Sequence, residues 1–179
     1  MKIDRTWAMP TPDTFQCLPI GAFVKRYLME SQISIDPFAR NCNWASITND
    51  LNPKTSAMYH MDVKDFLLMV QVQGIKPDLV IFDPPYSPHQ IKQCYQNIGV
   101  TMGSNDGQRP GRWSFEKDII NDITTTGGVV LTFGWNTYGM GKSRGFEIEE
   151  ILLVCHGAGH NDTICMAERK AYVQHALFT

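Results

Sequence analysis

One segment constrains the fold more than any other: residues 78–83, DLVIFD, place four consecutive apolar side chains between two aspartates. A strand that is apolar at every position is buried on both of its faces. Such a strand belongs in the middle of a mostly parallel sheet with helices packed against both sides. The segment therefore predicts a layered α/β fold.

The rest of the chain alternates predicted helices and strands, as this architecture requires. Apolar residues that recur every three or four positions predict helices over 20–28, 62–70, 88–98 and 115–123. Apolar or alternating runs predict strands over 33–36, 45–50, 58–61, 78–83, 129–133, 146–155 and 163–168. The last two strands flank a glycine-containing turn and predict an antiparallel hairpin. The expected fold is a mostly parallel seven-stranded sheet with a C-terminal antiparallel hairpin and helices on both faces.

The length and charge of the chain narrow the possible functions. A chain of 179 residues predicts a single domain over 1–179, with no separate domain for target recognition. Its 16 basic and 18 acidic residues give a net charge of −2, which excludes a polybasic nucleic-acid binder but not an enzyme with a local basic rim. The chain has no long apolar run and no apolar leader, so we expect a soluble cytoplasmic protein, monomeric or homodimeric, without a membrane span.

Acidic or amide side chains stand where four successive predicted strands end. Because the carboxyl ends of parallel strands share one edge of a sheet, and ligands bind at that edge, we expect these side chains to lie together. Carboxylates suit ribose hydroxyls, amino groups and cationic ligands, whereas phosphate favours glycine-rich turns and helix N-termini. The pattern predicts a site for a positively charged nucleoside. The residues concerned are Asp36, Asn49, Asp50, Asp62 and Asp83.

A glycine-rich segment at residues 139–143, GMGKS, resembles the end of a phosphate-binding P-loop. The P-loop pattern needs another glycine upstream, where this chain has Asn136, and no amphipathic helix pattern follows the segment. A surface loop with a basic tip is the favoured interpretation.

The five cysteines are scattered and never form a C-x-x-C pair, which favours free thiols over disulfides. One local group of metal-binding side chains, Cys155, His156, His160 and Cys165, lacks the tight paired spacing of structural zinc sites. We therefore predict two strand cysteines that flank a polar turn, and no metal site.

The most specific motif, Asp83-Pro84-Pro85-Tyr86, follows the buried strand directly. In this motif and its position the chain resembles the class I S-adenosylmethionine (SAM)-dependent amino methyltransferases, and among them the DNA adenine methyltransferases with a D-P-P-Y motif. The resemblance covers most of the chain and is to small phage- or prophage-encoded members. It implies a Rossmann-like class I methyltransferase fold, SAM as the cofactor and adenine in DNA as the methyl acceptor.

The resemblance also implies which residues contact the cofactor. The segment around Phe15 is similar to the family's N-terminal methionine-binding motif, and residues 36–38, DPF, are similar to its first motif. Asp50 and Asp62 stand where the second and third acidic contacts belong, and we expect Asp50 to bind the ribose hydroxyls. The implied cofactor contacts are Phe15, Asp36, Pro37, Phe38, Asn49, Asp50, Asp62 and Asp83.

The chain departs from the family pattern after the D-P-F segment. Residues 39–41, ARN, replace the glycine-rich turn that the family usually has there. About a dozen residues separate Asp36 from Asp50, so we expect the first crossover helix to be short or absent. One assigned contact also has a purely structural alternative, because Asp62 can act as the N-cap of the following helix.

The D-P-P-Y turn suits methylation of an aromatic exocyclic amine, which is a weak nucleophile because its lone pair is delocalised into the ring. A carboxylate and a backbone carbonyl that accept its two N–H groups free that lone pair for attack. Asp83 and the carbonyl of Pro84 can supply these acceptors, while Pro84 and Pro85 stiffen the turn. Tyr86 can stack on a base rotated out of a duplex. The alternative interpretation is a rigid turn that only ends a strand.

A long polar segment with four glycines, residues 99–113, is the element that we expect to close over nucleic acid. Its two arginines can bind phosphates and its tryptophan a base, and a loop without function is the alternative. Trp135 is expected either to contact a base or to pack in the core. The expected nucleic-acid contacts are Tyr86, Arg109, Arg112, Trp113, Trp135, Lys142 and Arg144.

The sequence therefore favours an enzyme that methylates the N6 amine of adenine in DNA. By resemblance, the aspartate of D-P-P-Y favours adenine over cytosine or glutamine, and adenine in RNA stays open as an acceptor. The alternative of a different class is a catalytically silent module that binds the cofactor and DNA.

Overall fold

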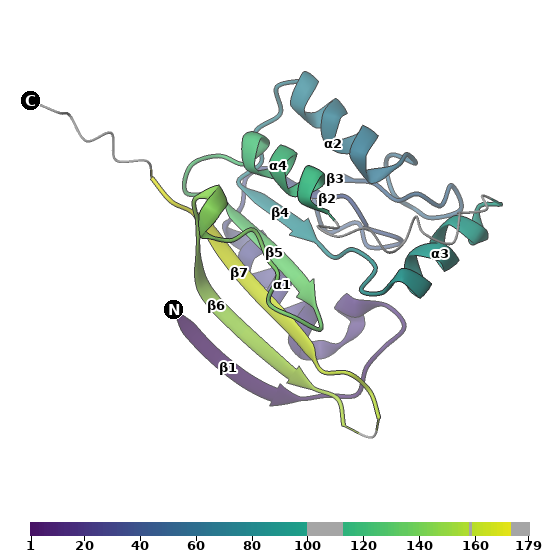
Figure 1. The fold of residues 1–179 in the computed structure, drawn as a ribbon, viewed down its shortest axis with the longest axis vertical. Helices are drawn as coiled ribbons and strands as arrows, with labels where there is room; N and C mark the ends of the chain where they lie inside the picture. The colour runs from purple at the N-terminus through teal and green to yellow at the C-terminus, as the bar shows by residue number, and fades with distance from the viewer. Residues whose placement is uncertain (100–112, 158, 173–179) are drawn as a thin grey trace, which may run out of the picture.

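The computed structural model describes residues 1–99, 113–157 and 159–172, and within them seven strands form one sheet (Figure 1). The strands are β1 (Lys2–Trp7), β2 (Ser34–Asp36), β3 (Ile47–Thr48), β4 (Leu79–Phe82), β5 (Val129–Gly134), β6 (Phe146–Cys155) and β7 (Thr163–Lys170). Their order across the sheet is β1-β6-β7-β5-β4-β2-β3. Neighbouring strands are parallel, except that β7 is antiparallel to both β5 and β6.

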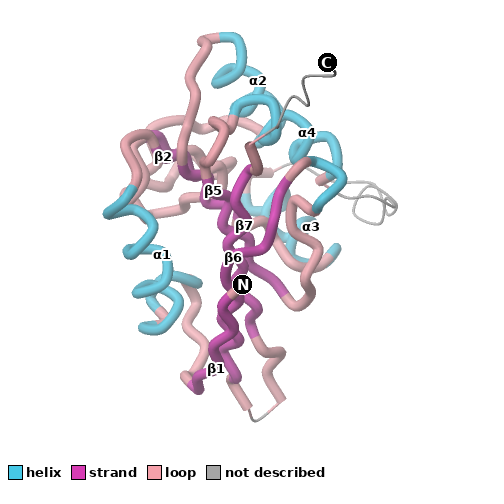
Figure 2. The backbone as a smooth tube through the Cα atoms, turned by 90° about the vertical axis from the view of Figure 1, so that its left-hand side faces the viewer, coloured by secondary structure: helices cyan, strands magenta, loops and turns pink. Residues whose placement is uncertain are grey.

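Helices cover both faces of the sheet, as the sequence predicts (Figure 2). The described helices are α1 (Leu18–Glu30), α2 (Val63–Val72), α3 (Pro88–Asn97), α4 (Ser114–Ile123) and the short 3-10 helices η1 (Thr14–Gln16) and η2 (Lys142–Arg144). α1 packs on one face, whereas α2 and α4 pack side by side on the other. α3 follows β4 beyond the carboxyl end of that strand (Figure 1). None of these helices is long and apolar enough to cross a membrane.

The core consists of two apolar clusters, one on each face of the sheet. α1 packs over Leu79 and Ile81 of β4, while α2 and α4 pack over Val80 and Phe82 of the same strand. Successive side chains of a strand point to opposite faces, so all four of these residues are buried. The prediction of a central strand buried on both faces is confirmed.

The strands of the sheet differ from the predicted ones in two places. β1 carries no apolar pattern, because five of its six residues are exposed at the edge of the sheet. Residues 58–61 form no strand but a single bridge between Tyr59 and Asn49. The count of seven strands is correct, with β1 in place of the segment 58–61, and the antiparallel hairpin of β6 and β7 is confirmed.

The connection between β2 and β3 contains no helix, which confirms the expected loss of the first crossover helix. Residues 37–46 instead form turns held to the strand ends by backbone hydrogen bonds. The N–H of Ala39 donates to the carbonyl of Asn49 at 2.8 Å, and the N–H of Asn49 donates to the carbonyl of Asp36 at 2.9 Å. The loop therefore lies against the carboxyl ends of β2 and β3.

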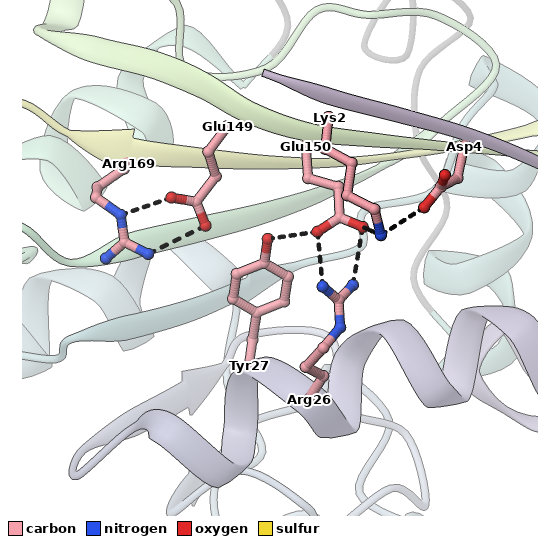
Figure 3. Close-up of polar contacts among 7 residues, drawn as sticks. All are labelled: Lys2, Asp4, Arg26, Tyr27, Glu149, Glu150 and Arg169. Atoms are coloured by element: carbon pink, nitrogen blue, oxygen red, sulfur yellow. Dashed lines mark hydrogen bonds and ion pairs between the residues drawn. The ribbon is translucent and has the colours of Figure 1, made fainter.

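A buried carboxylate anchors β1 and α1 to the sheet (Figure 3). Glu150 of β6 is 5 % exposed and accepts hydrogen bonds from both terminal nitrogens of Arg26 at 2.8 and 2.9 Å. It also accepts the Tyr27 hydroxyl at 3.0 Å and Nζ of Lys2 at 3.2 Å. Lys2 stands opposite Glu150 in the β1–β6 register, whereas Arg26 and Tyr27 belong to α1. These charge-assisted bonds offset the cost of burying the carboxylate and hold an exposed edge strand.

Candidate active site

The acidic residues meet where the strand order reverses. From β2 the chain first adds β3 on one side and then returns to add β4 on the other. In open α/β sheets, ligands bind in the crevice that such a reversal leaves beyond the carboxyl ends of the strands. Asp36 ends β2, Asp50 follows β3 and Asp83 follows β4, so the three carboxylates surround the position that this rule gives for a ligand, which we call the crevice.

Asp36 is the most deeply buried of these three residues, since only 1 % of its surface is exposed. Burial raises the pKa of Asp36 well above its ordinary value, and the carboxylates of Asp83 and Asp50 add to the effect. The N–H of Phe38 donates a 3.0 Å hydrogen bond to Asp36 and works in the opposite direction. Carboxylates that repel one another in this way favour a positively charged ligand.

Asp83 is half-buried, and its Oδ1 accepts a 2.6 Å hydrogen bond from the hydroxyl of Tyr86. Burial raises the pKa of Asp83 to about 6, although the hydrogen bond from Tyr86, the hydroxyl of Thr14 and the positive charge of Arg40 favour its ionised form. At neutral pH the carboxylate is therefore ionised and able to accept further hydrogen bonds.

The turn that carries Asp83 leads directly into α3 and is held by a capping box. The hydroxyl of Ser87 accepts the N–H of Gln90 at 3.2 Å, and the side chain of Gln90 accepts the N–H groups of Ser87 and Tyr86 at 3.1 and 2.7 Å. Pro88 occupies the first turn of the helix. These contacts fix the backbone of the D-P-P-Y turn, in which proline rings already restrict φ.

A cleft of about 330 Å³ lies between Tyr86 of the D-P-P-Y turn, Trp135 after β5 and the turn between β6 and β7. Tyr86 and Trp135 form an aromatic pair in its wall, with ring centroids 5.7 Å apart and ring planes at 71°. The remaining wall comes from residues 10–14, from the start of α1 and from the β6–β7 turn. The crevice and the cleft therefore meet at the D-P-P-Y turn, and the cleft suits a planar ring.

The two residues after β3, Asn49 and Asp50, differ in whether their side chains are free to bind a ligand. The half-buried carboxylate of Asp50 accepts two backbone N–H groups, at 2.8 and 3.1 Å, and keeps further lone pairs. Asn49 is 1 % exposed, and its amide group bonds to backbone groups of Pro37 and Met61. Asp50 can therefore bind a ligand, whereas the amide of Asn49 joins the loops around the crevice.

Asp62 is the N-cap of α2, because its carboxylate accepts the N–H of Lys64 at 3.0 Å. The second oxygen accepts the hydroxyl of Tyr95 at 2.5 Å and so ties α3 to the start of α2. The capping role that the sequence offered as the alternative is confirmed. A ligand contact would use the lone pairs that these two bonds leave.

Phe15 lies in η1 and packs against both Trp44 and Phe133, with ring centroids 6.0 and 5.2 Å away. Phe133 belongs to the buried cluster on the α1 face of the sheet, and Phe15 packs against that cluster. Phe15 and Tyr86 of the D-P-P-Y turn thus pack against the same cluster, and the contact of Phe15 with the cofactor stays a prediction.

Trp113 and Phe38 pack on the opposite face of the sheet. The ring of Phe38 contacts those of Phe82 and Trp113, with centroids 5.5 and 5.4 Å away. Trp113 is thus half-buried in an aromatic cluster, and of the base contacts expected from the sequence only Tyr86 and Trp135 line the cleft in the described part of the chain. Two further expected contacts, Arg109 and Arg112, lie outside the described residues, as does most of the expected closing segment.

The backbone of η2, which carries Lys142 and Arg144, leads into the start of β6 at the edge of the sheet away from the acidic strand ends, and neither residue lines the cleft. β5 ends at the carboxyl edge, and the chain then returns along the sheet to begin β6 at the other edge, where Phe146 pairs with Lys170. Arg144 is held there by the carboxylate of Asp118 on α4, at 2.7 Å. The path of this connection depends on packing against α4 and leaves no periodic pattern in the sequence.

The polar turn after β6 is held by His156, which is 3 % exposed. Its Nδ1 lies 2.6 Å from the carbonyl of Ala8 and donates to it, while Nε2 lies 2.9 Å from the hydroxyl of Thr163. Both ring nitrogens are therefore engaged with protein groups. Among the residues that the structure describes, no group of three or more His, Cys, Asp or Glu side chains is arranged to hold a metal ion.

Three residues that shape the site are not among the site residues expected from the sequence. Thr14 lines the cleft beside Tyr86, Gln90 holds the D-P-P-Y turn, and Arg40 contacts the N-terminal segment. Thr14 leaves no signal in the sequence, whereas Gln90 belongs to an S-x-x-Q pattern, residues 87–90, which is typical of a capping box. Arg40 leaves a weak signal, since it stands where the resembled family has a glycine-rich turn.

No family model matches the chain, and no curated protein matches its sequence. Solved structures of methyltransferases are similar to it in fold. The N-methyltransferase NodS from Bradyrhizobium japonicum is 8 % identical, with a TM-score of 0.53 over 90 % of this chain and 99 % of its own. SMU.776, in complex with SAH, is 11 % identical, with a TM-score of 0.53 over 82 % of this chain and 48 % of its own.

NSun6 from Pyrococcus horikoshii, solved with SFG, is 13 % identical, with a TM-score of 0.51 over 82 % of this chain and 50 % of its own. This chain thus spans about half the length of SMU.776 and NSun6. The strand order, the antiparallel β7 and the helices on both faces agree with this likeness. The chain has the Rossmann-like fold of the class I SAM-dependent methyltransferases.

Proposed function

We propose that this protein transfers the methyl group of SAM to the exocyclic amine of adenine in DNA. One observation carries the proposal: Asp83 stands between a crevice flanked by carboxylates and a cleft with an aromatic wall. A methyl donor in the crevice and a planar acceptor in the cleft meet at this carboxylate, and a transfer reaction requires that alignment.

The crevice suits SAM, which supplies a methyl group on a positively charged sulfur. The carboxylate of Asp50 has lone pairs for ribose hydroxyls, the pairing that acidic residues make in dinucleotide-binding folds. The buried carboxyl group of Asp36 favours a cation nearby. Two SAM analogues, the SAH bound to SMU.776 and the SFG bound to NSun6, support the same choice.

Asp83 and the turn behind it activate the acceptor amine. Because Tyr86 occupies Oδ1, the second oxygen of Asp83 accepts one N–H of the amine, and the carbonyl of Pro84 accepts the other. The two bonds draw the nitrogen toward tetrahedral geometry and free its lone pair. As the new N–C bond forms, the C–S bond breaks, its electron pair stays on sulfur, and the amine proton leaves through the carboxylate of Asp83.

The cleft suits a nucleobase because Tyr86 and Trp135 offer aromatic surfaces to a planar ring. An amine inside a stacked duplex is out of reach, so the base has to rotate out of the helix. The family resemblance of the D-P-P-Y motif favours adenine among the planar amines.

Transfer of isotope-labelled methyl from SAM to a panel of acceptors tests the proposal. The panel contains unmethylated duplex DNA, duplex DNA without adenine, RNA and a glutamine-containing peptide, with products identified by mass spectrometry. We expect N6-methyladenine from the first acceptor only. Label in cytosine, RNA or glutamine instead would move the acceptor to that class, and SAM binding without any transfer would indicate the silent module.

A further inference from the structure

Arg40 has a backbone conformation that is unusual for a residue with a side chain. Its φ of 50° lies in the left-handed region, which glycine adopts freely and other residues avoid. Its N–H donates to the carboxylate of Asp50 at 3.1 Å, while the preceding N–H, of Ala39, donates to the carbonyl of Asn49 at 2.8 Å. The residue is therefore fixed against the loop that follows β3.

The side chain of Arg40 reaches the N-terminal segment. Its Nη1 donates to the carbonyl of Pro12 at 2.8 Å and lies 2.7 Å from Oδ1 of Asp13. Residues 10–14 form part of the wall of the cleft. One residue thus joins the loop beside the crevice to the wall of the cleft, although the two segments are far apart in the sequence.

The segment that Arg40 holds continues to the reacting carboxylate. Thr14 follows Asp13 and lines the cleft together with Tyr86, and its hydroxyl favours the ionised form of Asp83 by lowering the pKa of that carboxyl. The positive charge of Arg40 also favours the ionised form of Asp83. A shift of this segment would move both the wall of the cleft and a hydroxyl group that favours the ionised form of Asp83.

These contacts contribute little to the stability of the fold. The side chain of Arg40 is 58 % exposed and that of Asp13 is 38 % exposed, and ion pairs this accessible to water add little to the free energy of unfolding. The left-handed backbone costs free energy that glycine would not lose. Loss of the Arg40 side chain should therefore change the position of the N-terminal segment more than the stability of the protein.

We propose that Arg40 is a positioning residue for methyl transfer, a role that rests on the function proposed above. Arg40 fixes the wall of the cleft, and Thr14 with it, relative to the crevice that binds the methyl donor. The alignment of donor and acceptor depends on this distance, and a misplacement of about 1 Å slows such reactions strongly.

The variants Arg40→Gly and Arg40→Ala test the proposal, with Arg169→Ala as the control. Arg169 also forms an exposed ion pair, with Glu149 at 2.6 Å, but it lies near the end of β7, at the edge of the sheet away from the site. For Arg40→Gly we expect an unfolding temperature close to that of the wild type, because glycine accepts this φ. We expect kcat to fall by at least ~10-fold while the affinity for SAH changes by less than ~3-fold. Arg169→Ala should keep the wild-type kcat.

Amide hydrogen exchange gives a readout that needs no ligand. In Arg40→Gly the amides of Thr11 and of residues 13–16 should exchange faster, while those of β4 stay unchanged. Asp13→Ala should act in the same way, and the double variant should be no worse than either single variant, because the two side chains act as a pair.

The outcomes separate this proposal from the proposed function. An Arg40→Gly variant with wild-type kcat would overturn the role of Arg40 and leave the function intact. If kcat falls in both Arg40 variants and the unfolding temperature falls with it, the loss of activity comes from a less stable fold, and the positioning role would also be overturned. A wild-type protein that methylates no acceptor would overturn the proposed function. Faster exchange in Arg40→Gly would then show only that Arg40 holds the N-terminal segment in place.

Discussion

At the scale of single residues, Asp83 and Tyr86 form one hydrogen-bonded unit. Burial and the charge of Asp83 raise the pKa of the Tyr86 hydroxyl, so this hydroxyl stays protonated and donates to Asp83 across the neutral range. The bond holds the carboxylate in one orientation and leaves its second oxygen for a ligand. The proposed chemistry therefore depends on the ionisation of Asp83, with Tyr86 as its partner and as a surface for the base.

Asp83→Asn should lower kcat for methyl transfer by ~100-fold or more, because the amide has no charge and can present an N–H where an acceptor is needed. The affinity for SAH, measured by calorimetry, should change by a few-fold at most. Asp78→Asn is a matched control, since Asp78 lies at the other end of β4 and binds the N–H groups of Gln32 and Ile33 at 2.8 and 3.0 Å. Equal activity of the two variants would contradict the role of Asp83.

The raised pKa of Asp83 predicts the pH profile of the reaction. Transfer that requires the ionised carboxylate should rise with pH up to about 6 and level off above it. Because burial raises the pKa in the folded state above the ordinary 3.8, the folded protein holds this proton longer, and the contribution of Asp83 to stability falls as pH rises from 3.8 to about 6. A wild-type kcat that does not change between pH 5 and pH 7 would argue against this assignment.

At the scale of elements, the edge strand β1 depends on long-range contacts rather than on its own sequence. Most of its residues are exposed, and its one neighbour in the sheet is β6. Glu150 links this strand to the sheet and to α1 through Lys2, Arg26 and Tyr27 (Figure 3). The strand in turn places the residues that follow it, 8–16, beside the cleft.

Glu150→Gln should lower the free energy of unfolding by about 2 kcal/mol, because it removes a buried charge that holds the Arg26 guanidinium by two hydrogen bonds. Glu149→Gln, one residue away, should cost less than about 1 kcal/mol, because its partner Arg169 is 44 % exposed. Urea denaturation at pH 7 measures both values. Equal losses in the two variants would contradict the anchoring role of Glu150.

The stabilisation by Glu150 should disappear in acid. Burial opposes the charged form, but hydrogen bonds from Arg26, Tyr27 and Lys2 prevail and lower the pKa of Glu150 below its ordinary value of 4.5. The stabilisation is therefore complete above pH 4.5 and is lost as the pH falls through the lower folded-state pKa. The difference in unfolding free energy between wild type and Glu150→Gln should shrink at the lowest pH at which both fold.

At the scale of the whole molecule, the order of strands separates two ligand regions around one turn. β2 and β3 carry the carboxylates of the crevice, while β5 and the β6–β7 turn carry the wall of the cleft. β4 lies between them and delivers Asp83 to their meeting point. The backbone of η2 lies at the far edge of the sheet, so Arg40 is the basic residue that the described part of the chain places beside these carboxylates.

This charge distribution predicts which nucleosides stabilise the protein. SAH at 100 times its Kd should raise the free energy of unfolding by about 2.7 kcal/mol, which thermal unfolding records as a rise of several degrees in Tm. ATP should cause no comparable rise, because carboxylates repel its phosphates. Asp50→Ala should abolish most of the effect of SAH. An equal rise with ATP, or none with millimolar SAH, would show that the crevice is not a SAM site.

The sequence alone was sufficient for features whose physical cause is local. The apolar segment at residues 79–82 had to become a buried central strand, because burial on two faces requires apolar side chains at every position. The acids at the ends of β2, β3 and β4 were predictable for a related reason, since parallel strands bring their carboxyl ends to one edge. The single-residue cap at Asp62 was also visible as an alternative.

Only the tertiary structure decided the features that depend on contacts between distant segments. The backbone of η2 lies at the far edge because the chain returns along the sheet after β5. Trp113 packs on Phe38 because the start of α4 meets the loop after β2. β1 pairs with β6 through a charged cluster that no local pattern reveals. Burial and hydrogen bonding between such distant residues depend on which elements become neighbours in the fold. The residue pattern of a segment indicates only whether that segment favours a helix or a strand and which of its faces is apolar.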